Sequence, residues 1–238
     1  MKIGGSIFEE PSVIEEFLRI FFQKRSVKMK YVILSGGGRE CDNLREIFKA
    51  DSLKEIHQDQ YHWKAITLME INTVRIKTMM DFLLQDSHAV ITSKITKINS
   101  GKPGIYYFLP YQNLYDEDPL EHSWRVTSDS IAIYYANLLN SRICLLIKHK
   151  PYLFLNNRLI RSISASELYH LHRDAEFSQN LGKGLVDPMG PELCLKFKIP
   201  ILILDGTNRT LISRFFSQYP HETNYSDLSK YGLVIYPK

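Results

Sequence analysis

Two glycine-rich stretches, Lys2-Ile3-Gly4-Gly5-Ser6 and Tyr31-Val32-Ile33-Leu34-Ser35-Gly36-Gly37-Gly38, decide the fold of this chain. In each, a short apolar run typical of a buried strand ends in glycines, and an amphipathic segment follows. Glycine has no Cβ, so its backbone can approach an anion closely and can adopt positive φ. A helix that begins after such a turn adds unpaired N–H groups and the positive end of its dipole. The two stretches therefore predict phosphate-binding turns, with Lys2 as a mobile charge beside them, as phosphoryl transfer requires.

Outward from these turns, short runs rich in β-branched residues alternate with longer segments of helical spacing. This alternation predicts an α/β protein with a largely parallel sheet. Strands are predicted at residues 1–3, 30–34, 89–92, 105–109, 143–148, 201–204 and 233–236.

Helices are predicted where apolar residues recur three and four positions apart. The segments are residues 12–23, 40–49, 127–139, 165–177, 188–197 and 208–218. Thr127 is a suitable N-cap for the third of these helices. Asn156-Asn157 lies between two apolar runs and tolerates the left-handed conformation, which predicts a β-hairpin over residues 151–163.

Composition limits the class of protein. With 238 residues and 44% hydrophobic content, the chain can form one large domain; a soft division near residue 140 would give lobes of about 1–140 and 141–238. The net charge of +4 has no long Lys/Arg block, which fits an anionic small molecule better than nucleic acid. Three scattered cysteines suggest neither a disulfide framework nor a zinc site. The lack of a long apolar run or a signal-peptide core favours a cytoplasmic protein without membrane contact.

The order of several motifs resembles that of the amino acid kinase superfamily. The motifs are Lys2-Ile3-Gly4-Gly5-Ser6, Ser35-Gly36-Gly37-Gly38, the run from Asp118 to Ala132, and Leu145-Leu146-Ile147-Lys148. The part His122-Ser123-Trp124-Arg125-Val126-Thr127-Ser128-Asp129-Ser130 is similar to the branch that phosphorylates an aminomethylfuran-methyl phosphate in methanofuran biosynthesis. Tyr61-His62-Trp63-Lys64-Ala65-Ile66 resembles another element of that branch.

The resemblance implies a three-layer α-β-α sandwich and an ATP-dependent kinase that uses Mg²⁺. It also implies a small phosphorylated substrate and a homo-oligomer. Lys2 and Asp129 would be catalytic, the aspartate holding lysines in place. The implied ATP-binding residues are Gly4, Gly5, Ser6 and Lys148, and the implied substrate-binding residues are Gly36, Gly37, Gly38, Thr127 and Ser128. No metal ligand is named, because Mg²⁺ usually bridges phosphates and keeps several waters.

Several interpretations stay open at this stage. Asp129 could also complement the dipole of a helix start. His62 and His122 are either substrate contacts or packed polar groups. Asp116, Glu117 and Asp118 could pair with a substrate ammonium or form a solvated acidic loop, and Lys183 is a candidate for a second catalytic lysine. The chain could also be a non-catalytic nucleotide or metabolite sensor, since His149-Lys150-Pro151 replaces the family's Asp-Gly, or a kinase for another phosphate or carboxylate acceptor.

Overall fold

The computed structural model describes residues 1–84, 89–173, 185–219 and 224–238. Within these residues, one eight-stranded sheet has the order β3-β4-β2-β1-β5-β9-β10-β8, and every neighbouring pair runs parallel except β9 with β10. The strands are β1 (Lys2–Ile3), β2 (Lys30–Ser35), β3 (Val90–Thr92), β4 (Gly104–Phe108), β5 (Cys144–Lys148), β8 (Ser162–Ser164), β9 (Ile201–Asp205) and β10 (Leu233–Tyr236). The predicted α/β class with a mainly parallel sheet is confirmed.

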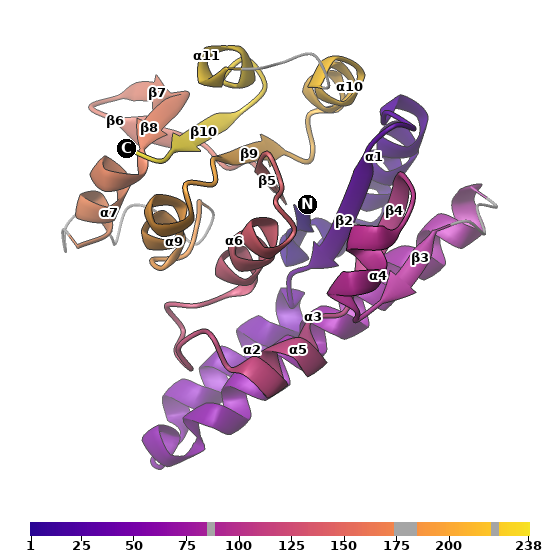
Figure 1. Cartoon of the computed structure of the whole chain (residues 1–238). Coiled ribbons are helices and arrows are strands. Elements are labelled where there is room, and N and C mark those ends of the chain that lie inside the picture. Colours follow the sequence, from indigo (N-terminus) through magenta and orange to yellow (C-terminus); the bar gives the residue numbers. More distant parts are fainter. Residues whose placement is uncertain (85–88, 174–184, 220–223) are drawn as a thin grey trace.

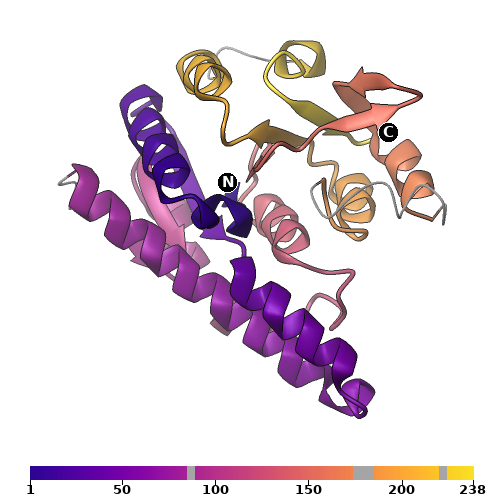
Figure 2. The same ribbon diagram turned by 180° about the vertical axis from the view of Figure 1, so that it is seen from behind.

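Helices cover both faces of the sheet and complete a three-layer sandwich (Figures 1 and 2). They are η1 (Gly5–Glu9, a 3-10 helix), α1 (Pro11–Lys24), α2 (Gly38–Ala50), α3 (Lys54–Leu84), α4 (Ile95–Ser100), α5 (Tyr111–Glu117), α6 (Ser128–Leu138), α7 (Ala165–Arg173), α9 (Gly190–Phe197), α10 (Arg209–Gln218) and α11 (Tyr225–Leu228). None of the described helices is long and apolar enough to cross a bilayer.

Two hydrophobic cores lie on opposite faces of the sheet. On one face, α1 and α10 pack through aromatic side chains, with Phe21 and Phe216 rings 5.0 Å apart between their centroids. On the other, α6, α7 and α9 cover the strands, and Ile131, Leu168 and Leu193 are buried there. Because successive side chains of a strand point to opposite faces, the central strands contribute to both cores.

Helix α3 crosses from one core to the other, and the sequence patterns did not predict it. Ile66 and Met69 belong to the core of α6, whereas Ile76 and Met80 belong to the core of α1. Exposed apolar residues elsewhere on this helix, such as Phe82 at 84% exposure, obscure the buried stripe in the sequence. Figures 1 and 2 show α3 paired with α2 in a long arm that extends past the sheet.

The other predicted elements have outcomes of three kinds. The strand positions and the helices α1, α2, α6, α9 and α10 are confirmed within one or two residues at each end. The hairpin is also confirmed: β6 (Leu153–Leu155) and β7 (Arg158–Ile160) pair, and Asn156 and Asn157 have φ of 50° and 59°. The last residues of the predicted helix at 165–177 lie outside the described residues. β8 was not predicted as a separate strand, because its three residues follow the hairpin without a break in composition.

The first strand is short but central. β1 has two residues, and it pairs with β2 on one side and β5 on the other, so it joins the two halves of the sheet. The glycine turns that follow β1 and β2 touch: a Cβ built on Gly5 would lie 2.2 Å from the backbone nitrogen of Gly38. Gly38 itself has φ of 66°, in the left-handed region that favours glycine. The close approach of the two turns therefore requires glycine at residue 5, and the left-handed backbone favours glycine at residue 38.

Replacing Gly5 by alanine should destabilise the fold by about 1–3 kcal/mol, because the new methyl group would overlap backbone that cannot move aside like a side-chain end. Urea unfolding followed by circular dichroism would measure the change. Ser6→Ala, at the next and exposed position, is the matched control and should stay within about 0.5 kcal/mol of the parent. Equal stability of the two variants would contradict the tight contact between the turns.

Candidate functional site

A buried carboxylate between two lysines forms the centre of the site. Lys2 Nζ donates to Asp129 Oδ1 over 2.9 Å, and Lys148 Nζ donates to Asp129 Oδ2 over 2.6 Å. All three residues are less than 9% exposed. A single aspartate therefore binds both ammonium groups, one through each of its carboxylate oxygens.

Three neighbouring elements bring these side chains together. β1 and β5 are adjacent parallel strands. Lys2 pairs with Leu146, so it lies close to Lys148, which is two residues further along β5. Asp129 is in the first turn of α6, where its charge faces the positive end of the helix dipole. The predicted N-cap is confirmed, since the Thr127 side chain accepts from the backbone N–H of Asp129. Both interpretations of Asp129, lysine partner and dipole complement, hold.

Burial and neighbouring charges shift the protonation of Asp129 and Lys148. Burial acts to raise the pKa of Asp129, but the charges of Lys148 and Lys2 outweigh it and lower the pKa to about 2. Burial lowers the pKa of Lys148 from its ordinary value, and Asp129 opposes that shift. Asp129 is therefore ionised at neutral pH and holds cationic groups in a site from which water is largely excluded.

A second buried carboxylate, Asp187, fixes the start of α6. Its oxygens accept from the backbone N–H and hydroxyl of Thr127, each over 2.8 Å, and from the N–H and hydroxyl of Ser130. The N–H of Gly190, at the start of α9, donates to the same group over 2.9 Å. Burial and then the charge of Asp129 raise the pKa of Asp187. Sequence reasoning missed Asp187; the only local signal was an aspartate before Pro188 and the following helix.

The two glycine turns surround the lysine–aspartate group. The N–H of Gly4 donates to Ile147 O and that of Gly36 to Ile3 O, so both extend the strand pairing. The N–H groups of Gly5 and Gly38 are the first in their helices and have no acceptor within them. N–H groups at the start of a helix, such as these two, can donate to an anion.

Gly36 is closely packed at the centre of the site. A Cβ built there would lie 2.9 Å from the backbone nitrogen of Gly5 and 3.2 Å from both Lys2 Cε and Ser128 Oγ, so a larger residue would not fit without a shift. The structure thus brings Gly36 and Ser128 of the predicted acceptor set together with Lys2, Asp129 and Lys148.

The remaining predicted residues lie at the border of this centre. Gly37 is buried under Cys41, Ser6 is exposed on η1, and the Thr127 hydroxyl is engaged by Asp187. Lys183 lies outside the described residues. The described part of the chain has no group of three or more His, Cys, Asp or Glu side chains placed to hold a metal ion, and its three cysteines are free thiols.

The sequence of this chain matches the model of the amino acid kinase family over residues 1–204. The chain belongs to the amino acid kinase family. Family membership makes the protein a phosphotransferase. The chain is also 26% identical over 211 residues, 87% of each protein, to a Methanocaldococcus jannaschii protein named [5-(aminomethyl)furan-3-yl]methyl phosphate kinase.

Solved structures show the same fold. Uridylate kinase from Archaeoglobus fulgidus has a TM-score of 0.60 at 14% identity, with 98% of each chain covered. Aspartate kinase from Synechocystis has a TM-score of 0.64 at 13% identity; all of this chain is covered, but it spans 39% of that longer protein. At these identities the likeness supports the fold.

Asp129→Asn should lower the free energy of unfolding by about 3–5 kcal/mol, because it leaves two buried ammonium groups without their counter-charge. Urea denaturation at neutral pH would measure the loss. Glu15→Gln, which breaks the exposed pair with Arg19, is the control and should cost no more than about 0.5 kcal/mol. If both variants lost equally little, the three buried charges would not stabilise one another.

Asp187→Asn should cost about 2–3 kcal/mol, because an amide NH₂ would face donors that now point at a carboxylate oxygen. Amide hydrogen exchange should also show faster opening of the first turn of α6, which a uniform loss of stability would not single out. The exposed Asp116→Asn change supplies the control. Unchanged exchange in that turn would show that Asp187 does not hold it.

Proposed function

We propose that this protein transfers the γ-phosphoryl group of ATP, with Mg²⁺, to a phosphate oxygen of a small phosphorylated alcohol, forming a diphosphate. The observation that supports it most directly is the pair of buried lysines on Asp129, between two glycine turns that approach each other. This arrangement concentrates positive charge beside the two glycine turns.

The proposed chemistry needs cations more than a base. In phosphoryl transfer the charge spreads over the oxygens of a loose transition state, and fixed positive groups stabilise it. Lys2 and Lys148 provide such groups, and Asp129 holds them in place while its own charge stays buried. A phosphate acceptor is already ionised at neutral pH, so no residue has to remove a proton from it. Mg²⁺, when bound with ATP, neutralises phosphate charge and needs few protein ligands.

The two glycine turns divide the ligands between them in this proposal. Gly4, Gly5 and Ser6 lie on the ATP side with Lys148, and the N–H of Gly5 is free to donate there. On the acceptor side, the backbone of Gly36 lies close to Lys2, and Gly38 contributes its N–H group. The backbone at Gly37, Thr127 and Ser128 completes this side. Lys148 joins ATP binding to the centre because it also contacts Asp129.

For the acceptor we propose [5-(aminomethyl)furan-3-yl]methyl phosphate, which would place the protein in methanofuran biosynthesis. Two findings support this choice: the Trp124–Ser130 run and the similarity to the M. jannaschii protein with that name over 87% of both chains. The proposal also includes a cytoplasmic homo-oligomer, in which the halves 1–140 and 141–238 act as acceptor and nucleotide lobes.

Lys2→Met and Lys148→Met should each reduce kcat by about 100-fold or more, because each removes one cation that faces the developing charge. A coupled assay for ADP with the aminomethylfuran phosphate as acceptor would measure the rate. Lys24→Met, at an exposed position, should keep the parent rate. Circular dichroism must show that both site variants are folded.

The same assay separates the kinase from a sensor on the same scaffold. Calorimetry that detects ATP binding, with no ADP formed for the furan phosphate or for other phosphate and carboxylate acceptors, would favour the sensor and overturn the proposed transfer. Turnover with another acceptor alone would keep the kinase and reject the furan substrate.

A further inference from the structure

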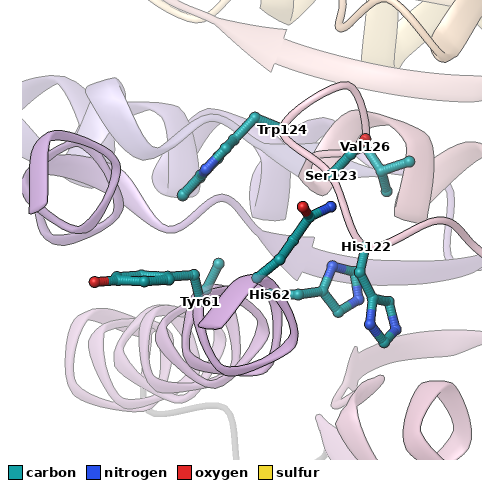
Figure 3. A pocket seen from close by; sticks show the side chains of 8 residues that line it. Tyr61, His62, His122, Ser123, Trp124 and Val126 are labelled. Atoms are coloured by element: carbon teal, nitrogen blue, oxygen red, sulfur yellow. The ribbon is translucent and has the colours of Figure 1, made fainter. Parts of the chain in front are cut away.

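Two loops near the lysine–aspartate centre are held in different ways. The loop before α6 packs against α3 through its rings: His122 stacks on His62 with 4.1 Å between centroids, and Figure 3 shows these two rings side by side. The pocket that remains there, lined by Tyr61 and Trp124 among others, has a volume of about 30 Å³. That volume is on the scale of a single water molecule. The loop before α6 is therefore fixed by packed side chains.

The loop that follows β5 is held by polar contacts. It comprises residues 149–152, directly after Lys148, and leads into the hairpin of β6 and β7. Its Lys150 has φ of 45°, a left-handed conformation that is unfavourable for a residue with a side chain. Such a conformation persists where neighbouring contacts stabilise it. Here those contacts come from Asp205.

Asp205 lies beside Lys148 in the sheet. It is the last residue of β9, and it pairs with Lys148 in the parallel register of β5 and β9. The next residue, Gly206, donates its N–H to Lys148 O over 2.7 Å. A Cβ built on Gly206 would lie 2.5 Å from Ile7 Cδ1 and 2.9 Å from Ile147 Cγ2, so a larger residue would not fit without a shift. The end of β9 therefore fixes the backbone at Lys148.

The Asp205 carboxylate reaches from the sheet to the loop. Its Oδ1 accepts from the Lys150 N–H over 3.3 Å, and from the N–H and hydroxyl of Thr207 over 2.9 and 2.7 Å. Its Oδ2 accepts from the Tyr152 hydroxyl over 2.6 Å. Asp205 is 6% exposed, whereas Tyr152 is 50% exposed, so the tyrosine is anchored at its hydroxyl end. Both carboxylate oxygens are used.

These contacts keep the carboxylate ionised. Burial acts to raise the pKa of Asp205, but the hydrogen bonds from Tyr152 and Thr207 outweigh it and lower the pKa. The hydrogen bond to Asp205 raises the pKa of Tyr152, which therefore keeps its proton at neutral pH. Hydrogen bonds to an ionised acceptor are stronger than those to a neutral one. The loop is thus attached most firmly when Asp205 is charged.

An exposed contact holds the same loop on its other side. His149 Nε2 lies 3.2 Å from Oε1 of Glu10, the residue between η1 and α1. The two side chains are 31% and 55% exposed, and ion pairs at exposed positions contribute little. The loop beside Lys148 therefore depends mainly on Asp205.

We propose that Asp205 is a positioning residue for the nucleotide: through Tyr152 and the Lys150 N–H it fixes the loop after β5, and with it Lys148, in the arrangement that binds ATP. The proposal rests on the proposed function, because that function places Lys148 on the ATP side. Lys148 is then held at both ends by carboxylates, its ammonium by Asp129 and its backbone neighbourhood by Asp205. The acceptor side should not respond to changes at Asp205.

Calorimetric titration with MgATP measures this role without turnover. Asp205→Ala removes every contact of the carboxylate and should weaken ATP binding by about tenfold or more. Tyr152→Phe removes only the contact of Oδ2 and should weaken binding by about threefold to tenfold. Asp205→Asn should restore most of the affinity, because the amide oxygen can accept from Lys150 and Thr207 while its NH₂ donates to the Tyr152 oxygen.

Two controls match these changes. Glu10→Gln alters the exposed contact of the same loop, and Tyr115→Phe makes the tyrosine change at an exposed position on α5. Both should bind ATP as the parent does. In steady-state assays with the aminomethylfuran phosphate, KM for ATP should rise in Asp205→Ala and Tyr152→Phe, whereas KM for the acceptor should stay unchanged. A purely stabilising role would reduce the amount of active protein without changing either KM.

The outcomes separate this role from the proposed function. Folded Tyr152→Phe and Asp205→Ala proteins that bind ATP like the parent, or an equal rise in KM for both substrates, would overturn the role of Asp205 and leave the kinase intact. If Asp205→Ala does not fold, Tyr152→Phe and Asp205→Asn decide. The expected binding pattern without ADP formation for any acceptor would support Asp205 and reject the proposed transfer. A parent that does not bind ATP would overturn both.

Discussion

The structure depends on one buried interaction, the hydrogen-bonded contact of Asp129 with Lys2 and Lys148. Taking three charged groups out of water is costly, and it is tolerated only where the geometry is good and the remaining polar atoms are satisfied. That requirement fixes β1, β5 and the first turn of α6 relative to one another. Asp187 adds a second constraint, since its contacts with Thr127, Ser130 and Gly190 tie α6 to α9. The charged centre is thus built from both halves of the chain.

The shortness of β1 makes the surrounding contacts more important. Two residues offer few ladder hydrogen bonds, yet Lys2 must be held firmly enough to position its ammonium. The strand is supported from both sides by β2 and β5, and the N–H groups of Gly4 and Gly36 continue the pairing beyond its end. The contact between Gly5 and Gly38 then closes the turns over the site. Gly4 and Gly36 therefore extend the pairing of the strands. Gly5 and Gly38, in contrast, are the first residues of their helices, and their N–H groups have no acceptor within those helices.

Local signals in the sequence were enough to predict the parallel sheet, the hairpin at Asn156-Asn157 and the Thr127 cap, because each depends on neighbours in sequence. The grouping of Lys2 with Asp129, 127 residues apart, was implied only by the resemblance to amino acid kinases. The contact between Lys148 and Asp129 was not predicted, because it depends on the register of β5 beside β1. Asp187 was missed because its partners on α6, Thr127 and Ser130, lie 60 and 57 residues away. α3 was missed because exposed apolar residues dilute its buried stripe.

That long helix also holds the glycine turn beside Lys2. Thr73 on α3 accepts from the N–H of Ser35, and Asn72 donates to Gly36 O, so the helix supports the turn beside Lys2. Gly36 has to stay close to Gly5 and Lys2, where a Cβ would already be crowded. The position of this turn is therefore set by α3 on one side and by the pairing of β1 with β2 on the other.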